Sequence, residues 1–335
     1  MFEKKYYAGI DYFRMIAALL VVTIHTRPLE SFGKTADFML SGIAARVAVP
    51  FFFMASGFFL LFGCAGHTGD AGKLFRFVKK TAIVYAAATL LYLPVNIYRG
   101  YFSAENIVSK VMQDIVFDGT WYHLWYLPAS VAGAAIAGVL VRKAGLKASL
   151  AITGILYVIG VFGDSYLGIV RQVPVLSDFY RLTFQVCDYT RNGIFFAPVF
   201  LALGGYLADR KRILSVKKSL CGFLITFGLL FAEAVLLRPF EAEHHDSMYF
   251  FLLPCMYFLF SLILHWKGKC PVWFKTVSLI VYIIHPMMII LLRPAAKLLA
   301  LQQPLLENSL IHYAAVCLLS LLVSVLCILR GGKKR

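Results

Sequence analysis

Apolar blocks of about 20 residues recur along this chain, and they constrain its fold more than any other feature. The chain is 60% hydrophobic and 15% charged, whereas a soluble domain is about 45–50% apolar and about 25% charged. In a bilayer each backbone N–H and C=O must find a partner inside the protein, so spanning segments are helices or closed barrels. The alternating segments typical of barrel strands are absent. The sequence therefore predicts an all-α, polytopic membrane protein.

We expect about ten transmembrane helices in a single transmembrane domain that covers residues 1–335. The expected spans are 9–28, 38–63, 75–97, 122–142, 149–164, 193–209, 219–237, 247–265, 275–293 and 309–329. Segment 104–118 is amphipathic and too charged to cross, so we expect it to lie at the interface. No cleavable signal peptide is expected, because the first apolar run contains Asp11 and Arg14 and has no small-residue cleavage site.

The net charge of +16 is distributed unevenly over the predicted loops. With ten spans, most of the 33 Lys and Arg residues fall on one side of the membrane. Because cytoplasmic loops are enriched in Lys and Arg, both termini are expected in the cytoplasm, with the chain in the bacterial cell membrane. This bias explains the charge without nucleic-acid binding. The seven cysteines lack CxxC or metal-ligand spacing, so we expect no disulfide framework and no metal site.

Arg14 and His25 both lie in the first predicted span. Eleven residues at about 100° each return a helix to nearly the same face, roughly 16 Å further along. An ionisable residue inside a span costs a few kcal/mol or more, so each is a candidate functional residue. One interpretation pairs Arg14 with Asp11 and leaves His25 at the outer interface. In the other, His25 is a general base facing a cavity, and Arg14 positions an anionic or polar group.

Further polar residues stand in or beside predicted spans. Tyr282 and His285 share a helix face, and Pro286 frees backbone carbonyls there, which favours a cavity over a packed pair. His123 and Trp125 fit either a site or an interfacial aromatic belt. For the remaining residues we weigh substrate contact against helix packing, capping or an interfacial position; they are Ser56 with Gly57, Arg46, Glu233, Asp246 with Ser247, and Arg191 with Asn192.

Four segments resemble signatures of the acyltransferase-3 family of membrane O-acyltransferases. They are IDYFRMIAALLVVTIH, in which ten residues separate an Arg from a His, VPFFFMASGFFL (49–60), HLWYL (123–127) and IVYIIHPMM (280–288). The resemblance implies that His25 and Arg14 are catalytic, with His25 deprotonating an acceptor hydroxyl or relaying the acyl group. It further implies an enzyme that transfers groups other than aminoacyl groups. The donor is cytoplasmic acyl-CoA, the acceptor is extracytoplasmic, and no cofactor stays bound.

The same resemblance suggests the residues that bind substrate. Arg76 and Lys79 match a basic patch of the family that could hold phosphates, although Lys lacks the fork of Arg and both fit plain positive-inside charge. The other expected contacts are His123, Trp125, Tyr282, His285, Ser56 and Asp246. Many members carry two glutamates after the His-x-Trp segment, where this chain has Pro128-Ala129-Ser130. That departure leaves the acceptor chemistry open.

A second set of segments resembles the membrane half of VanT-type serine racemases of vancomycin resistance. These segments are VAVPFFFMASG, YHLWYLPA, TRNGIFFAPVFLALG and HDSMYFFLLP. The resemblance implies a cytoplasmic C-terminal racemase domain as a partner, which this chain lacks, and an alternative function as an L-serine binding or uptake domain. No inverted repeat is evident, which counts mildly against a transporter. A plain membrane anchor would not explain why Arg14 and His25 share a helix face.

Overall fold

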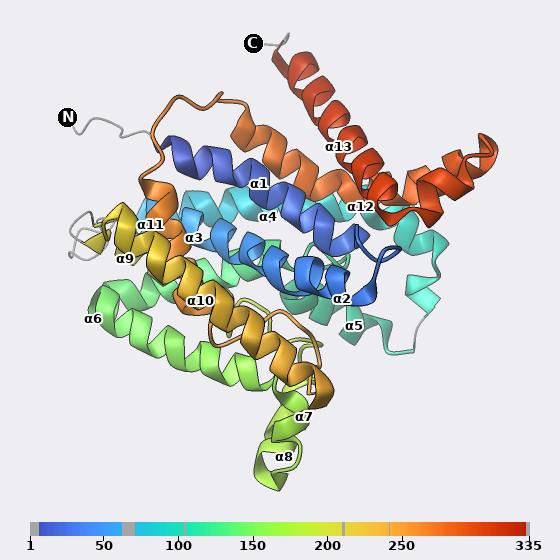
Figure 1. Ribbon diagram of the computed structural model, residues 1–335. Coiled ribbons are helices and arrows are strands. Elements are labelled where there is room, and N and C mark those ends of the chain that lie inside the picture. The colour runs from blue at the N-terminus through green and yellow to red at the C-terminus, as the bar shows by residue number, and fades with distance from the viewer. Residues whose placement is uncertain (1–6, 62–70, 104, 210–211, 241, 333–335) are drawn as a thin grey trace. The chain divides into compact units, whose positions relative to one another are not determined.

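The computed structural model describes residues 7–61, 71–103, 105–209, 212–240 and 242–332, and within these ranges it contains helices and no strands (Figure 1). Several basic residues on the side predicted to be cytoplasmic lie outside this part of the chain. They are Lys4, Lys5, Arg210, Lys211 and those at residues 333–335. The molecule divides into two compact units. Unit 1 comprises residues 1–52, 215–224 and 258–335, and unit 2 comprises residues 53–214 and 225–257. The division falls within helices α3, α10 and α11.

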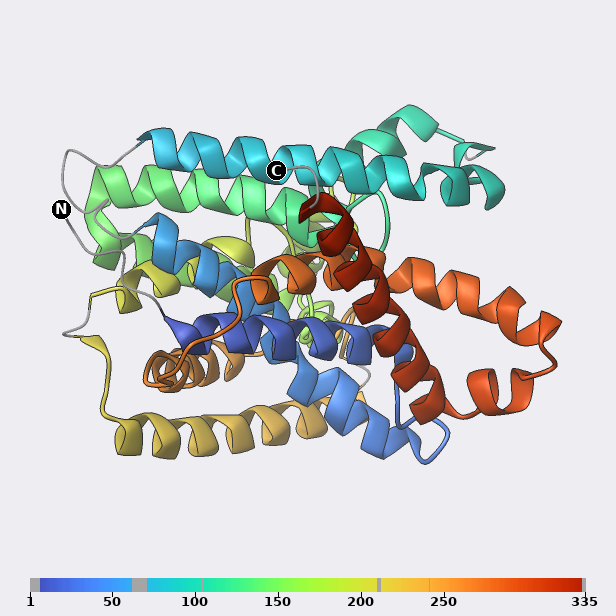
Figure 2. The same cartoon turned by 90° about the horizontal axis from the view of Figure 1, so that it is seen from above.

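Unit 1 is built around α1, α12 and α13. Its elements are α1 (Ala8–Thr26), α2 (Lys34–Asp37), η1 (Phe38–Ile43), η2 (Ala44–Val47), the first part of α3 (Ala48–Leu60), the first part of α10 (Val216–Leu237), the last part of α11 (Leu252–Leu264), α12 (Phe274–Leu298), η7 (Gln303–Glu307) and α13 (Ser309–Gly332). Helix α1 buries Ala18 and Val22 in one cluster with Val281 of α12 and Val316 of α13. Both views show α1 beside α12 (Figures 1 and 2). The positions of α1 and α12 bring the first and ninth predicted spans together.

Unit 2 holds the rest of α3, α10 and α11 together with nine further elements. These are α4 (Ala71–Tyr98), η3 (Tyr101–Ser103), α5 (Ile107–Gln113), η4 (Asp114–Asp118), α6 (Tyr126–Phe162), α7 (Leu167–Val170), α8 (Pro174–Thr183), α9 (Ala197–Leu207) and η6 (Arg238–Phe240). Helices α3 and α9 touch backbone to backbone: a Cβ at Gly57 would lie 1.9 Å from the Leu201 carbonyl oxygen. Small residues permit this approach between membrane helices.

Seven helices in the described part of the chain are long and apolar enough to cross a membrane, which is consistent with the predicted polytopic fold. Two shorter apolar helices, α9 and α11, accompany them. Two expected spans, 122–142 and 149–164, correspond for most of their length to the single element α6, which breaks at Gly145 with φ +77°. The ten-span count and the cytoplasmic termini stay predictions.

Three of the expected spans differ from the structure in the type of helix or in the residue at which the helix begins. The expected span 38–63 starts with π-helical η1 and 3-10 helical η2 before α3 begins at Ala48. Helix α9 begins at Ala197 rather than near 193, after a turn in which the side-chain oxygen of Asn192 accepts the N–H groups of Ile194 and Phe195. Helix α11 begins at Leu252 rather than near 247, because Glu233 accepts the N–H groups of the two residues before it.

Candidate functional site

Two histidines from distant parts of the sequence meet in unit 1. The rings of His25, in the last turn of α1, and His285, in α12, stack with centroids 5.2 Å apart and planes 25° apart. His285 is fully buried and His25 half-buried. Both were predicted site residues, and the fold brings them together.

The Tyr282-x-x-His285-Pro286 segment fixes the proton of His285. Pro286 has no N–H, so the carbonyl of Tyr282, four residues earlier, loses its helical donor. The Nδ1 atom of His285 lies 2.9 Å from this oxygen and 3.1 Å from the carbonyl oxygen of Val281. A carbonyl only accepts, so Nδ1 carries the proton and Nε2 is the basic nitrogen of the neutral ring.

Arg14 lies about three turns before His25 on α1. Its Nη1 atom pairs with the carboxylate of Asp11, and the Arg14 side chain is only 12% exposed. The ion pair agrees with the interpretation that partners Arg14 with Asp11. The carboxylate of Asp11 also neutralises the charge of Arg14 on a helix in which the nearby residues Phe13, Ala17 and Ala18 are buried. Arg14 is thereby held in place on the helix that carries His25.

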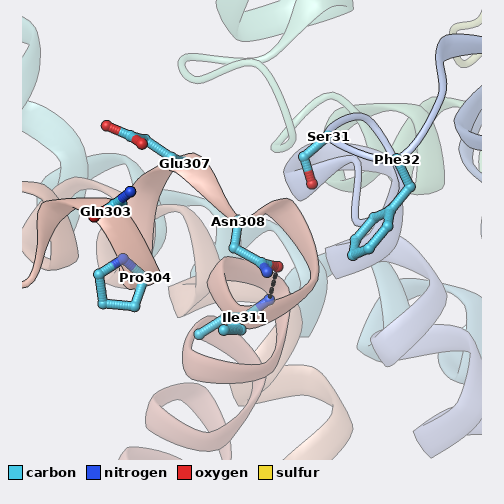
Figure 3. A pocket seen from close by; sticks show the side chains of 7 residues that line it. All are labelled: Ser31, Phe32, Gln303, Pro304, Glu307, Asn308 and Ile311. Carbon is cyan, nitrogen blue, oxygen red and sulfur yellow. Dashed lines mark hydrogen bonds between the residues drawn. The ribbon is translucent and has the colours of Figure 1, made fainter.

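An open pocket of about 520 Å³ lies beside the loop that follows α1 (Figure 3). Ser31 and Phe32 of this loop face Gln303, Pro304 and Glu307 of η7, with Asn308 and Ile311 completing the lining. The hydroxyl of Ser309 donates to the Pro28 carbonyl and lies 2.7 Å from that of Ser31. These bonds tie the start of α13 to the loop immediately beyond His25. Sequence analysis did not single out the pocket, because its two walls are about 270 residues apart in the chain.

In unit 2, His123 and Trp125 lie in an aromatic cluster before α6. The His123 ring meets the rings of Tyr92 and Tyr122 at 5.2 and 5.6 Å. Trp125 lies beneath the guanidinium of Arg191, whose carbon is 5.1 Å from the ring centroid. The same guanidinium lies 4.5 Å from the ring centroid of Tyr189, so two aromatic faces hold Arg191.

Asp164 lies in the loop just after α6, and its carboxylate binds the backbone of a second loop that contains Ser247 and Met248. Its Oδ1 accepts the N–H groups of Ser247 and Met248, each at 2.9 Å. Its Oδ2 accepts no hydrogen bond among the described residues. Burial raises the pKa of Asp164 to about 7, against the lowering effect of these N–H groups and of Arg191.

Asp246, which was predicted to contact the substrate, lies in the same loop as Ser247 and Met248. One of its carboxylate oxygens is 3.5 Å from Nδ1 of His245, and that nitrogen is 2.7 Å from the hydroxyl of Ser247. Asp246 is only partly buried, so it is open to solvent or a ligand. Glu233 has a structural role. Its carboxylate accepts a hydrogen bond from the hydroxyl of Tyr166 at 2.8 Å, in addition to those from the two backbone N–H groups before α11.

Three carboxylates of unit 2 have their ligand oxygens within 4.8 Å of one another: Asp114, Asp118 and Asp188. The ammonium of Lys110 bonds Asp114 at 2.9 Å and Asp188 at 2.8 Å. Asp118 accepts the backbone N–H groups of Asp188 and Tyr189. Lys110 thus supplies the positive charge that a metal ion would bring.

The remaining predicted contacts are in unit 2. Arg76 and Lys79 are exposed on the first half of α4, one turn apart. Ser56 precedes Gly57 in α3, where the backbone meets α9, so close helix packing explains the Ser-Gly pair.

Comparison with known proteins identifies relatives of this chain. Residues 7–329 match the acyltransferase-3 family model, which is described as an acyltransferase domain. An amino-acid racemase of Enterococcus faecalis is 50% identical over 97% of this chain, and a second is 37% identical over 95%. A serine/alanine racemase of Enterococcus gallinarum is 37% identical over 93% of this chain. The chain spans about 45% of the length of each of these relatives. No solved structure matches it significantly.

Proposed function

Because the chain belongs to the acyltransferase-3 family, we propose that it is a membrane acyltransferase that moves an acyl group from acyl-CoA to a hydroxyl on an extracytoplasmic acceptor. The observation that carries the proposal is the stacked pair of His25 and His285 inside a helical membrane unit. Imidazole is the usual general acid and base in proteins near neutral pH.

Two stacked imidazoles suit a reaction that removes one proton and returns another. Because like charges at this distance repel, the pair favours at most one proton beyond the two neutral rings. In the proposed reaction a histidine takes the proton of the acceptor hydroxyl, and the oxygen attacks the thioester carbonyl. The new C–O bond forms, the C–S bond breaks, and the proton passes to the departing thiolate of coenzyme A. The burial of His285 excludes water, which would otherwise hydrolyse the donor.

The other predicted residues receive supporting roles in this proposal. Arg14, held by Asp11, provides positive charge about three turns before His25 on the same helix and would orient the donor. Arg76 and Lys79 are exposed and would contact donor phosphates, Lys79 as a single point charge. The pocket at Ser31, Phe32 and Glu307 follows α1 directly and is our candidate for the acceptor's approach (Figure 3).

Turnover of acyl-CoA by the reconstituted chain tests this function. We expect His25→Ala to lower turnover by about 10²–10⁴-fold, the usual contribution of a general base. The matched control is His312→Ala, because His312 is a half-buried histidine of the same unit that bonds the Leu305 carbonyl and does not stack on the pair. Turnover by His25→Ala within about twofold of the wild-type value would refute the assignment.

L-serine binding is the second candidate function, and the racemase names of the three relatives favour it. A zwitterion needs a cation for its carboxylate and an anion for its ammonium group. Arg191 and Asp246 provide this combination in unit 2, where the charges of both act on Asp164. Saturable binding of radiolabelled L-serine, lost in Arg191→Gln and kept in His25→Ala, would support this candidate. No saturable binding at millimolar serine would reject it.

A further inference from the structure

Helix α8 is a short amphipathic helix whose apolar face is exposed. At about 100° per residue, its side chains divide into three arcs. One arc packs onto the protein through Tyr180, which is buried with Leu167 and Val170 of α7. A polar arc carries Asp178 and Arg181, which pair at 3.0 Å. The apolar arc consists of Val175, Leu176, Phe179 and Leu182, all of them exposed.

The height of α8 along the membrane span is set by a hydrogen bond. The hydroxyl of Tyr180 donates to the carbonyl of Ile159 at 2.6 Å, in the last turn of α6. The Tyr180 ring also packs against Gly163, one residue beyond that helix. Since α6 is a candidate span, α8 lies at the level where a span leaves the hydrocarbon. Figure 1 shows α8 pointing away from the end of α6 and running crosswise to it.

The exposed apolar surface of α6 ends beside α8. Ile155, Val158 and Phe162 recur at helical spacing on α6 and are exposed, as expected for side chains that face lipid. An apolar arc at the end of this stripe continues the lipid-facing surface into the interfacial layer. The polar arc adds Arg181, and Arg171 is exposed just before the helix, so cationic groups accompany the apolar face. That combination is typical of helices lying in the headgroup region.

We propose that α8 is an interfacial helix, with its apolar arc inserted among phospholipid acyl chains of the leaflet in which α6 ends. The occupant of this face is therefore lipid and not a second copy of the chain or another protein. Four exposed apolar side chains would otherwise face water, which is unfavourable for apolar surface. Their insertion also holds the long segment between α6 and α9 at a fixed depth.

Photo-crosslinking in the native membrane tests the proposal with the full chain. Benzoylphenylalanine is introduced singly at Phe179 or Leu182 on the apolar arc, and at Asp178 on the polar arc as the matched control. The same group at Ile155 of α6 reports the lipid adduct expected of a lipid-facing position. After irradiation, intact-protein mass spectrometry distinguishes a phospholipid adduct from a crosslinked protein.

We expect phospholipid adducts at Phe179, Leu182 and Ile155, at least about fivefold more abundant than at Asp178. Crosslinks from Phe179 and Leu182 to a second copy or to another protein would overturn the proposal and assign the face to protein docking. Lipid adducts at Ile155 together with none at Phe179 or Leu182 would overturn it too, since the face would then lie in water.

Discussion

The histidine pair of unit 1 and the buried carboxylates of unit 2 both place polar groups inside the protein, but the hydrogen bonds of the two sets differ. In unit 2 the carboxylates of Asp164, Glu233 and Asp118 each accept two backbone N–H groups from distant segments. In unit 1, His25 and His285 meet ring to ring, and the backbone bond of His285 engages only Nδ1.

The difference separates groups that hold the fold from groups suited to chemistry. A carboxylate that accepts several backbone N–H groups holds their segments in place, and removing it leaves buried donors unsatisfied. A histidine that spends one nitrogen on the backbone is oriented and keeps its other nitrogen basic. The same distinction divides the predicted polar residues, with Glu233 structural and His25 and His285 candidates for proton transfer.

The largest expected stability effect comes from removing the Asp164 carboxylate. Asp164→Ala leaves the buried N–H groups of Ser247 and Met248 without an acceptor, at about 1–3 kcal/mol each. We expect the melting temperature of the purified chain to fall by several degrees, whereas Asp164→Asn, which keeps one acceptor oxygen, loses far less. Equal melting temperatures for the Ala and Asn variants would contradict the structural role of Asp164.

Pro286→Ala should move stability and activity in opposite directions. The new N–H at position 286 can bond the Tyr282 carbonyl, which repairs the helix and competes with Nδ1 of His285. We expect an unchanged or higher melting temperature and about tenfold lower acyl-CoA turnover, measured on the same preparation. Undiminished turnover would mean that the proton position on His285 does not matter.

A smaller effect is the pH dependence of hydrogen exchange in the loop whose backbone Asp164 binds. The pKa of Asp164 is raised by burial to about 7 from its usual 3.8. Between these values the folded chain binds a proton that the unfolded chain has released, so this group's stabilising contribution is full below about pH 4 and declines as the pH rises towards 7. Hydrogen exchange across residues 242–248 should therefore be slower at pH 5.5 than at pH 7.5, after correction for intrinsic rates. Asp164→Asn should abolish that difference, and a difference that persists in this variant must arise elsewhere.

Local sequence predicted the helices whose apolar blocks are long and uninterrupted. Helices α1, α4, α10, α12 and α13 lie within a few residues of the expected spans, because bilayer thickness sets their length. The later starts of α9 and α11 were not predicted. The start of α11 depends on Glu233, whose carboxylate accepts backbone N–H groups of another segment. The division of the chain into two units likewise depends on tertiary contacts.

The candidate site was predicted residue by residue, but its geometry was not. Arg14, His25, Tyr282 and His285 were all chosen from the sequence, yet nothing local indicates that residues 25 and 285 stack. The role of Pro286 had a visible signal, because a proline frees the carbonyl four residues earlier and a histidine stood beside it. The role of Asp164 had no local signal in the sequence, because the residues that it binds are more than 80 positions away.

The most direct test of the account is a double-mutant cycle on the histidine pair, measured as acyl-CoA turnover by the reconstituted chain. If His25 and His285 act as one unit, His25→Ala and His285→Ala each cause a loss of about 10²-fold or more, and the double variant loses little beyond the worse single variant. Losses that multiply in the double variant, or turnover that survives it, would contradict the claim that the stacked pair performs the proton transfer.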